Sequence, residues 1–143
     1  MADRKRNIFV VDLDPFNLNL LRSVRHADEY VFHDLLDFEE IAAAARFNLE
    51  ALLEKARDTL RAFDQPIDAI VGYWDFPTIL MMAILRRELG LSGPTHESVL
   101  RCEHKYWARL EQAKVIPGEV PPFELVDPFD EAAVDRFGLT FPI

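Results

Sequence analysis

The sequence contains one cysteine, five glycines and no long hydrophobic run among its 143 residues. A single cysteine cannot form an internal disulfide, so we expect a reducing compartment, the cytoplasm. No window approaches the roughly 20 apolar residues of a membrane-spanning helix. The run Ile8 to Val11 is too short for a signal peptide. With glycine so scarce, neither a GxGxxG turn nor a P-loop is present, and a glycine-rich phosphate site is not supported.

Basic residues are also in deficit, with 16 Lys and Arg against 25 Asp and Glu and a net charge of −9. This balance argues against a nucleic-acid partner and against a membrane surface, because both present negative charge. HExxH, CxxC and His/Cys clusters are missing, so the sequence predicts no metal site. Half of the residues are hydrophobic, which is enough to form a buried core.

The first half of the chain alternates between strand and helix patterns. The apolar run Asn7 to Leu13 is typical of a parallel strand buried on both faces. Asp14 and Pro15 suit the N-cap and first residue of a following helix, whose apolar residues recur through Val24. A short second strand is predicted at Tyr30 to Phe32.

Residues 38–63 carry apolar residues at steps of three and four, which predicts one long helix or two with a break near Phe47 and Asn48. A third strand is predicted over 67–71, and the helix after it is closed by Gly90 in the manner of a C′ glycine. The order β-α-β-α-β-α predicts a parallel sheet with helices on both faces, a three-layer α-β-α arrangement.

Ligands of such sheets bind outside the carboxyl ends of the strands, where two loops fall, 12–17 and 72–77. The second loop groups aromatic residues with an acid; they could line a ligand pocket or an interdomain seam, Asp75 could cap the next helix, and Phe76 is expected in the core. The acidic and aromatic character favours an amine-bearing or ring-bearing small molecule. The predicted substrate-binding residues are Asp12, Asp14, Asn17, Gly72, Tyr73, Trp74 and Asp75.

The character of the sequence changes after Pro94, which predicts a first domain over 1–94 and a second region over 95–143. Thr95 could cap a helix with an apolar stripe from Val99 to Ala113, on which Cys102 would be a buried thiol. The remainder suggests a strand at 123–126, a helix at 130–137 and the start of a strand at 141–143.

The segment from Leu89 onward resembles the entry to an ATP-grasp domain. Its Leu-Gly-Leu-Ser-Gly-Pro turn is followed by a helix containing Lys105, then by Pro117, and then by Pro-Pro-Phe-Glu-Leu-Val-Asp at 121–127. Residues 1–94 then resemble the Rossmann-like pre-ATP-grasp domain of the biotin carboxylase and carboxylate–amine ligase families. His104 departs from the family pattern, which often has an acid before the lysine.

This resemblance implies an ATP-dependent ligase that joins a carboxylate to a nucleophile through an acylphosphate. In the family the first lysine contacts nucleotide phosphate, a role carried over here to Lys105 alone. ATP and Mg²⁺ would serve the full-length enzyme, whose second lysine, glycine-rich loop and Mg²⁺ ligands lie farther along. We therefore expect this chain to be the N-terminal part of such an enzyme, without catalytic residues and with weak or absent ATP binding alone.

A second interpretation is a stand-alone flavodoxin-like or receiver-like module that binds a ligand or another protein. The receiver comparison fails at one position, because five residues after Asp68 the chain has Tyr73 in place of a phosphoacceptor aspartate. The partners expected under the ligase interpretation are the remainder of the ATP-grasp domain and a small-molecule substrate. An uncovered apolar edge would also favour association between copies of the chain.

Overall fold

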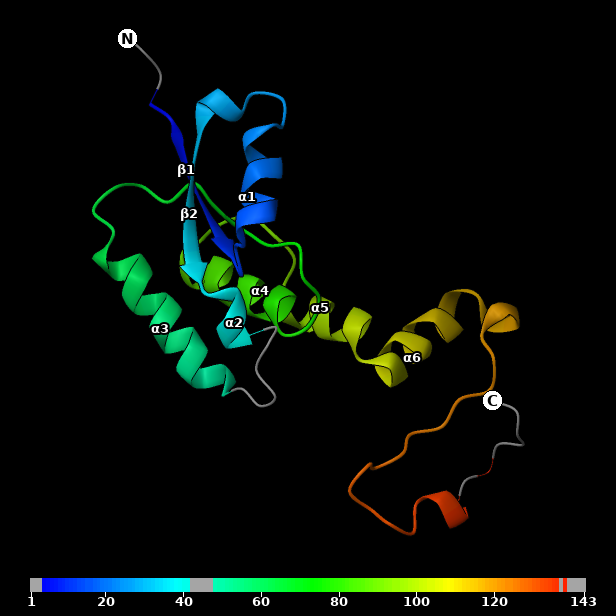
Figure 1. The fold of residues 1–143 in the computed structure, drawn as a ribbon. Helices are drawn as coiled ribbons and strands as arrows, with labels where there is room; N and C mark the ends of the chain where they lie inside the picture. Colours follow the sequence, from blue (N-terminus) through cyan, green and yellow to red (C-terminus); the bar gives the residue numbers. More distant parts are fainter. Residues whose placement is uncertain (1–3, 42–47, 137, 139–143) are drawn as a thin grey trace. The chain divides into compact units, whose positions relative to one another are not determined.

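The computed structural model describes residues 4–41, 48–136 and 138. The chain divides into two units, Met1–His96 (unit 1) and Glu97–Ile143 (unit 2). The described residues of unit 1 form three strands and four helices, arranged as in Figure 1. They follow the order β1 (Arg6–Val11), α1 (Pro15–Arg22), β2 (Tyr30–Leu36), α2 (Phe38–Ile41), α3 (Leu49–Ala62), β3 (Ala69–Val71) and α4 (Thr78–Glu88), with a 3-10 helix at Ala27–Glu29.

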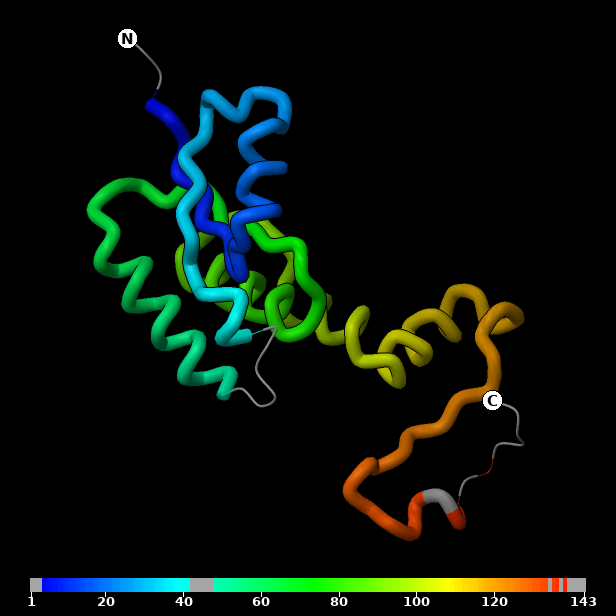
Figure 2. Tube along the Cα trace, viewed as in Figure 1, coloured from blue at the N-terminus to red at the C-terminus, as the bar shows by residue number. Residues whose placement is uncertain are grey.

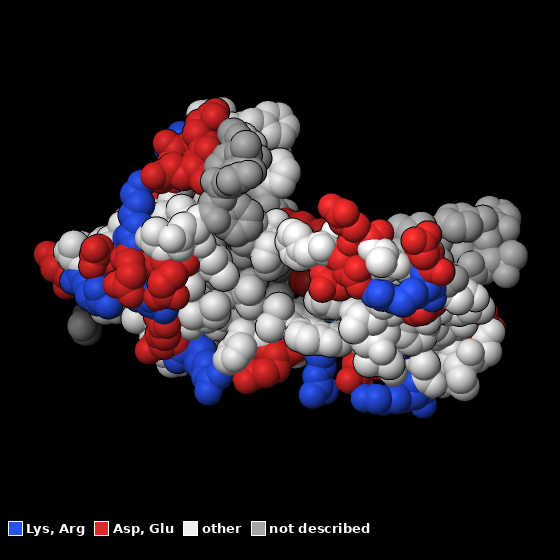
Figure 3. Space-filling model, turned by 90° about the horizontal axis from the view of Figure 1, so that it is seen from below, with Lys and Arg blue, Asp and Glu red and all other residues white. Residues whose placement is uncertain are grey.

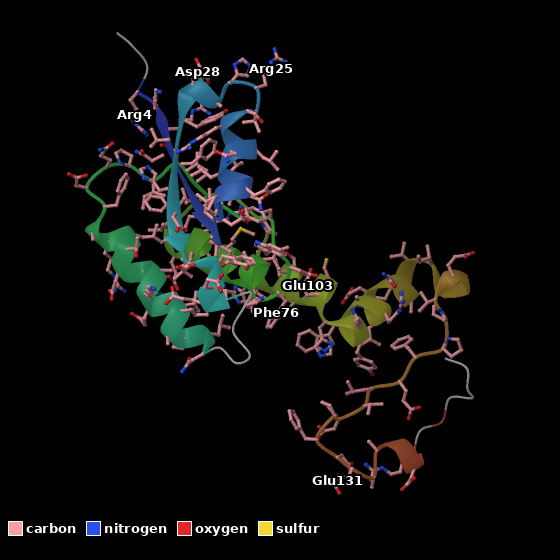
Figure 4. The ribbon with its side chains drawn as sticks, in the orientation of Figure 1. Arg4, Arg25, Asp28, Phe76, Glu103 and Glu131 are labelled. Carbon is pink, nitrogen blue, oxygen red and sulfur yellow. The ribbon has the colours of Figure 1, made fainter. Side chains whose placement is uncertain are left out.

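The three strands form one parallel sheet in the order β2-β1-β3. β1 is central, and its Phe9 pairs with His33 of β2 and with Ile70 of β3. The parallel direction follows from the helices that join the strands, because only a crossover can bring consecutive strands side by side in one direction. All three strands therefore end at the same edge, the carboxyl edge, which faces away from Arg4 and Asp28 and toward Phe76 (Figure 4).

One face of this sheet carries the hydrophobic core. Phe9 and Val11 of β1 and Ile70 of β3 pack there with buried residues of α3 and α4. Those helix residues are Leu53, Ala56, Leu60, Met81, Met82 and Leu85. α1 and α3 lie on opposite sides of the sheet (Figure 1), so the unit has helices on both faces, as the alternation of patterns predicts. The chain is thus a mixed α/β protein with a parallel sheet.

Local sequence accounts for several element ends. Asp14 is the N-cap of α1, with Pro15 as its first residue, and both predictions are confirmed. Asn48 caps α3 in the same way, its side chain accepting a hydrogen bond from the amide of Ala51. Gly90 has φ of +67°, the left-handed conformation expected of a glycine that ends a helix. The predicted join or break of the 38–63 helix around Phe47 lies outside the described residues.

β3 is an outer strand of the sheet, and an arginine of α4 binds to its backbone. Arg86 Nε donates a hydrogen bond of 2.7 Å to the carbonyl oxygen of Ile70. Gly93 lies against the same side chain, since a Cβ built there would come within 2.9 Å of Arg86 Cδ. Burial lowers the pKa of Arg86 from its ordinary value. A partly buried guanidinium thus pairs a carbonyl oxygen of the edge strand β3.

The described residues of unit 2 form α5 (His96–Glu103), whose first residue still belongs to unit 1, α6 (Lys105–Val115) and two short 3-10 helices at Pro117–Glu119 and Val134–Arg136. The single helix predicted from the 99–113 stripe is wrong: His104 adopts an extended backbone with ψ of 106° and separates two helices. Cys102 is exposed, which corrects the predicted buried thiol. The break at His104 was missed because the apolar stripe continues across it, and apolar spacing does not report the backbone dihedral angles of a single residue.

Two further predictions for unit 2 are wrong. Residues 123–126 form no strand, and in place of the helix predicted over 130–137 the described residues 131–136 form a turn followed by the 3-10 helix Val134–Arg136. A strand needs a neighbour to pair with, and the described part of unit 2 contains no strand at all. The strand predicted to begin at 141–143 lies outside the described residues.

Candidate functional site

The candidate site lies at the carboxyl edge of unit 1, where the loops after β1 and β3 meet. Its centre is a set of hydrogen bonds between these loops, which are about 60 residues apart in sequence. We call it the carboxyl-edge site and define it by Asp12, Asp14, Asn17, Asp34, Tyr73, Trp74 and Thr78. The first three residues follow β1, Asp34 lies in β2, and the others follow β3.

Asp12 is the first residue after β1 and is fully buried. Its φ of 59° lies in the left-handed region, which a non-glycine residue rarely adopts. One carboxylate oxygen, Oδ2, accepts a hydrogen bond from the Thr78 hydroxyl. The other, Oδ1, is buried without a hydrogen-bond partner. A strained backbone and an unsatisfied buried oxygen are both unfavourable for folding, and such features concentrate at functional sites.

Burial raises the pKa of Asp12 from 3.8 to about 6. The Thr78 hydrogen bond opposes this shift, whereas the negative charge of Asp34 adds to it. Asp34 keeps part of its surface in solvent, yet desolvation of its carboxyl group and the nearby Asp37 raise its pKa as well. The site therefore holds two carboxyl groups that take up protons more readily than ordinary aspartates do.

Asp14 and Tyr73 connect the two loops. Asp14 Oδ1 accepts from the Asn17 amide at 2.9 Å, and Asp14 Oδ2 accepts from Asn17 Nδ2 at 2.6 Å. The Tyr73 hydroxyl lies 2.5 Å from the Asp12 carbonyl and 2.8 Å from Asp14 Oδ2, so its one proton can serve either acceptor. Its oxygen accepts from the Asp14 amide at 3.2 Å. Hydrogen bonds from Asn17 lower the pKa of Asp14, which stays a carboxylate.

An aromatic surface borders these polar groups. The Trp74 ring lies 5.7 Å from the Tyr73 ring and 5.3 Å from the Phe38 ring, measured between centroids. Tyr73 is 40% exposed and Trp74 is 41% exposed. Phe76 is exposed as well, which corrects its predicted place in the core. Tyr73, Trp74 and Phe76 therefore expose flat apolar surface to solvent at the carboxyl edge.

The other two predicted site residues have structural roles here. Asp75 does not cap α4, because that helix begins at Thr78 after Pro77; its carboxylate accepts instead from the Phe76 amide at 2.8 Å. Gly72 is required by packing, since a Cβ there would lie 2.9 Å from Met82 Sδ and 3.0 Å from Thr78 Cγ2. The close approach of α4 to the end of β3 depends on this glycine.

The chemistry of the site favours cationic or ring-bearing ligands. The N-terminus of α1, where an anion could bind, is already filled by the Asp14 carboxylate. Carboxylates can pair with an ammonium or hydroxyl group, and the aromatic surface can hold a ring or a cation. Within the described residues no group of three or more His, Cys, Asp or Glu side chains could hold a metal ion.

Thr78 and Asp34 are functional candidates that sequence reasoning did not single out. Thr78 follows the loop by one residue, and only the fold brings its hydroxyl to Asp12. Asp34 falls in β2 beyond the predicted end of that strand at Phe32. Strand alternation could have identified it, because Tyr30, Phe32 and Asp34 share one face once the strand is extended.

Lys105 is the first residue of α6 in unit 2 and is exposed. Neither a hydrogen bond nor an ion pair of its ammonium group is found among the residues that the structure describes. Its neighbour His104 stacks on Trp107 with ring centroids 4.6 Å apart. On the face drawn in Figure 3, Lys and Arg lie in small separate groups with Asp and Glu among them. An exposed lysine of this kind could contact a phosphate.

Comparisons with known proteins give no family for this chain. No protein-family model, curated protein or solved structure matches it. In the described part of the chain, no helix is both long enough and apolar enough to cross a membrane. The ATP-grasp resemblance therefore remains a proposal.

Proposed function

We propose that unit 1 is a Rossmann-like, substrate-side domain of a cytoplasmic ATP-grasp ligase, and that Lys105 belongs to the start of its nucleotide-binding domain. The observation that carries this proposal is the carboxyl-edge site itself. Two loops that sequence patterns placed at the ends of parallel strands meet there, joined by the Tyr73 hydroxyl. Ligands of doubly wound sheets bind at this edge.

Asp12 gives more direct support for a functional role of the carboxyl edge than the topology of the sheet does. A buried carboxyl group with one unpartnered oxygen, a left-handed φ and a pKa near 6 reduces stability. Such a combination is typical of a site that was selected for binding or chemistry. We assign Asp12 and Asp14 to the polar side of the substrate site, and Tyr73 and Trp74 to its apolar side.

The substrate proposed for this edge carries an amine or an aromatic ring. The amine would pair with the carboxylates, and a ring would lie against Trp74. ATP would contact Lys105 through a phosphate oxygen, with the metal ions held by residues outside those described here. When bound, Mg²⁺ would offset the charge that develops on the transferred phosphoryl group.

Tryptophan fluorescence can test the substrate side, because the chain has two tryptophans. A Trp107→Phe variant leaves Trp74 as the only reporter. We expect aromatic amines to change its emission in a saturable way, and matched aromatic carboxylates to have no effect. Asp14→Asn should weaken amine binding about tenfold, and Glu119→Gln, a change at an exposed residue of unit 2, should leave it unaltered. Saturable binding of the carboxylates alone, or of neither class, would contradict the proposed substrate.

The nucleotide side has two independent tests. Calorimetry with Mg-ATP and the 143-residue chain should give no binding at micromolar concentration, and micromolar affinity would overturn that expectation. The coding sequence after the codon for Ile143 should continue into a Lys-Pro pair, a glycine-rich loop and paired carboxylates. A stop codon directly after Ile143 would favour a stand-alone module in place of a ligase domain.

A further inference from the structure

The face of the sheet opposite the hydrophobic core is only partly covered. A groove of about 530 Å³ on this face is lined by residues of all three strands and of α1. Its walls are largely apolar and include Ile8, Val10, Leu21, Phe32, Ala69 and Val71. On the other face, α3 and α4 pack against the same strands and bury six apolar side chains there: Leu53, Ala56, Leu60, Met81, Met82 and Leu85. The groove therefore leaves apolar sheet surface open on one side of unit 1.

The helix beside the groove has an unusual distribution of apolar residues. α1 has the sequence PFNLNLLR, and none of its residues is buried. Phe16 is 70% exposed, Leu20 is 51% exposed, and Val24, just after the helix, is 44% exposed. These three follow one another at steps of four, so they form one apolar ridge. α1 lies at the outside of unit 1, on the side of the sheet opposite α3 (Figure 2).

Little charge opposes contact at this surface, although the chain as a whole carries −9. Only Arg6 and Asp68 among the groove residues are charged. Asp68 is already neutralised, because both of its oxygens accept hydrogen bonds of 2.7 Å from Arg4. α1 itself carries a single charged residue, Arg22. Two acidic chains could therefore approach through this face with little repulsion between carboxylates.

We propose that a second copy of this chain covers this face, forming a two-fold symmetric dimer. Val24 belongs to the ridge and also lines the groove, so ridge and groove adjoin, and a two-fold axis can set the ridge of each copy against the groove of the other. An isologous interface requires this property, because each copy must offer both halves of the contact. The ridge of one copy fills the groove of its partner, and the two α1 helices lie next to each other between the two sheets. This proposal does not depend on the ligase assignment.

Light scattering after size-exclusion chromatography tests the proposal over a range of protein concentrations. We expect a dimer for the unaltered chain and at least a tenfold higher dissociation constant for Leu20→Lys and for Phe16→Ser. Both residues are exposed, so circular dichroism should confirm that the variants remain folded. Val115→Lys in unit 2, which replaces a residue 80% exposed, is the matched control and should leave the dimer unchanged.

Isotope-filtered NMR on mixed labelled and unlabelled protein locates the contact. Methyl contacts should run from Leu20 of one copy to Ala69 or Val71 of its partner. A chain that is monomeric at all concentrations overturns the proposal. So does a dimer whose dissociation constant is unchanged in Leu20→Lys and Phe16→Ser, whatever the effect of Val115→Lys. Saturable binding of an apolar dye to the groove of a persistent monomer would assign the surface to a small ligand instead.

Discussion

Unit 1 and unit 2 contain similar kinds of residues but differ in what they bury. Every buried apolar residue in the described chain except Val99 lies in unit 1. α4 of unit 1 buries six of its 11 residues, whereas α6 of unit 2, also 11 residues long, buries none. Unit 2 also leaves Phe129 and Val115 largely in solvent. Isolated helices of this length are marginal in water, so burial against a sheet distinguishes the two units.

The comparison separates a region that supplies its own core from one whose apolar residues remain uncovered. Ion pairs such as Lys114 with Glu111 support α6 locally, at 2.8 Å, but surface pairs of this kind contribute little. In the proposed ligase, the exposed residues of unit 2 would pack against the rest of the nucleotide-binding domain.

The largest effect is expected from the core of unit 1. Leu85→Ala removes a side chain that is 1% exposed, and it should destabilise the chain by about 2–5 kcal/mol because it leaves a cavity. Phe129→Ala removes a larger side chain that is 93% exposed in unit 2, and its effect should stay within about 0.5 kcal/mol. Urea unfolding followed by circular dichroism compares the two. Equal losses would show that unit 2 has a core of its own.

Asp12→Asn should stabilise the chain at pH 7.5 by roughly 2 kcal/mol, since a pKa raised from 3.8 to about 6 makes the buried charge unfavourable. Between these pH values the folded state binds more protons than the unfolded state, so the unaltered chain loses stability as pH rises. Asparagine tolerates a positive φ and can still accept from Thr78.

The pH dependence provides the control for this substitution. The advantage of Asp12→Asn should shrink as pH falls through about 6 toward 4, where the aspartate of the folded state is protonated and its buried charge is lost. Asp58→Asn, an exposed site on α3, should show no such trend. A variant that is less stable than the unaltered chain at pH 7.5 would mean that the Asp12 charge is stabilised in the folded state.

Helix caps give the next comparison. Asp14→Ala removes both the cap of α1 and an acceptor for Tyr73, and should cost about 0.5–2 kcal/mol. His104→Ala acts at the N-cap of α6, where the side chain makes no capping hydrogen bond, so this variant should lose much less stability than Asp14→Ala. Thermal unfolding of the two variants measures the difference. A larger loss of stability for His104→Ala than for Asp14→Ala would contradict the conclusion that Asp14 is the stabilising cap.

The smallest effect is expected from a single hydroxyl group. Tyr73→Phe removes the bridge between the loops after β1 and β3 and should cost about 0.5–1.5 kcal/mol. Tyr106→Phe is the matched change in unit 2, where the ring packs on Phe123 at 5.5 Å between centroids, and should be neutral. Urea titrations at one pH compare both variants with the unaltered chain. Equal effects would argue against a specific role for the Tyr73 hydroxyl.

Local chemistry made part of the fold predictable. The β1–α1 turn could be read from Asp14 and Pro15, and the end of α4 from Gly90, because capping depends on residues adjacent in sequence. The parallel sheet followed from alternating patterns. The end of β2 was missed because His33 and Asp34 interrupt its apolar run before the buried Leu35 and Leu36.

The sequence predicted where the site lies but not which of its side chains contact one another. Strand ends predicted the loops with Asp12 and Tyr73, and these residues do meet. The partnership of Asp12 with Thr78, 66 residues away, depends on the packing of α4 and has no periodic pattern. The extended backbone at His104 could not be predicted either, because the apolar stripe of the two helices continues through it.

The Arg86 contact with the Ile70 carbonyl has a consequence for how copies of the chain can meet. An open sheet edge is a template for strands of other molecules, and proteins protect such edges with charge. The guanidinium already occupies a carbonyl of β3, and two such edges brought together would also set like charges against each other. Edge-to-edge growth into long sheets is therefore opposed, and association is left to the helical face, where it closes at two copies.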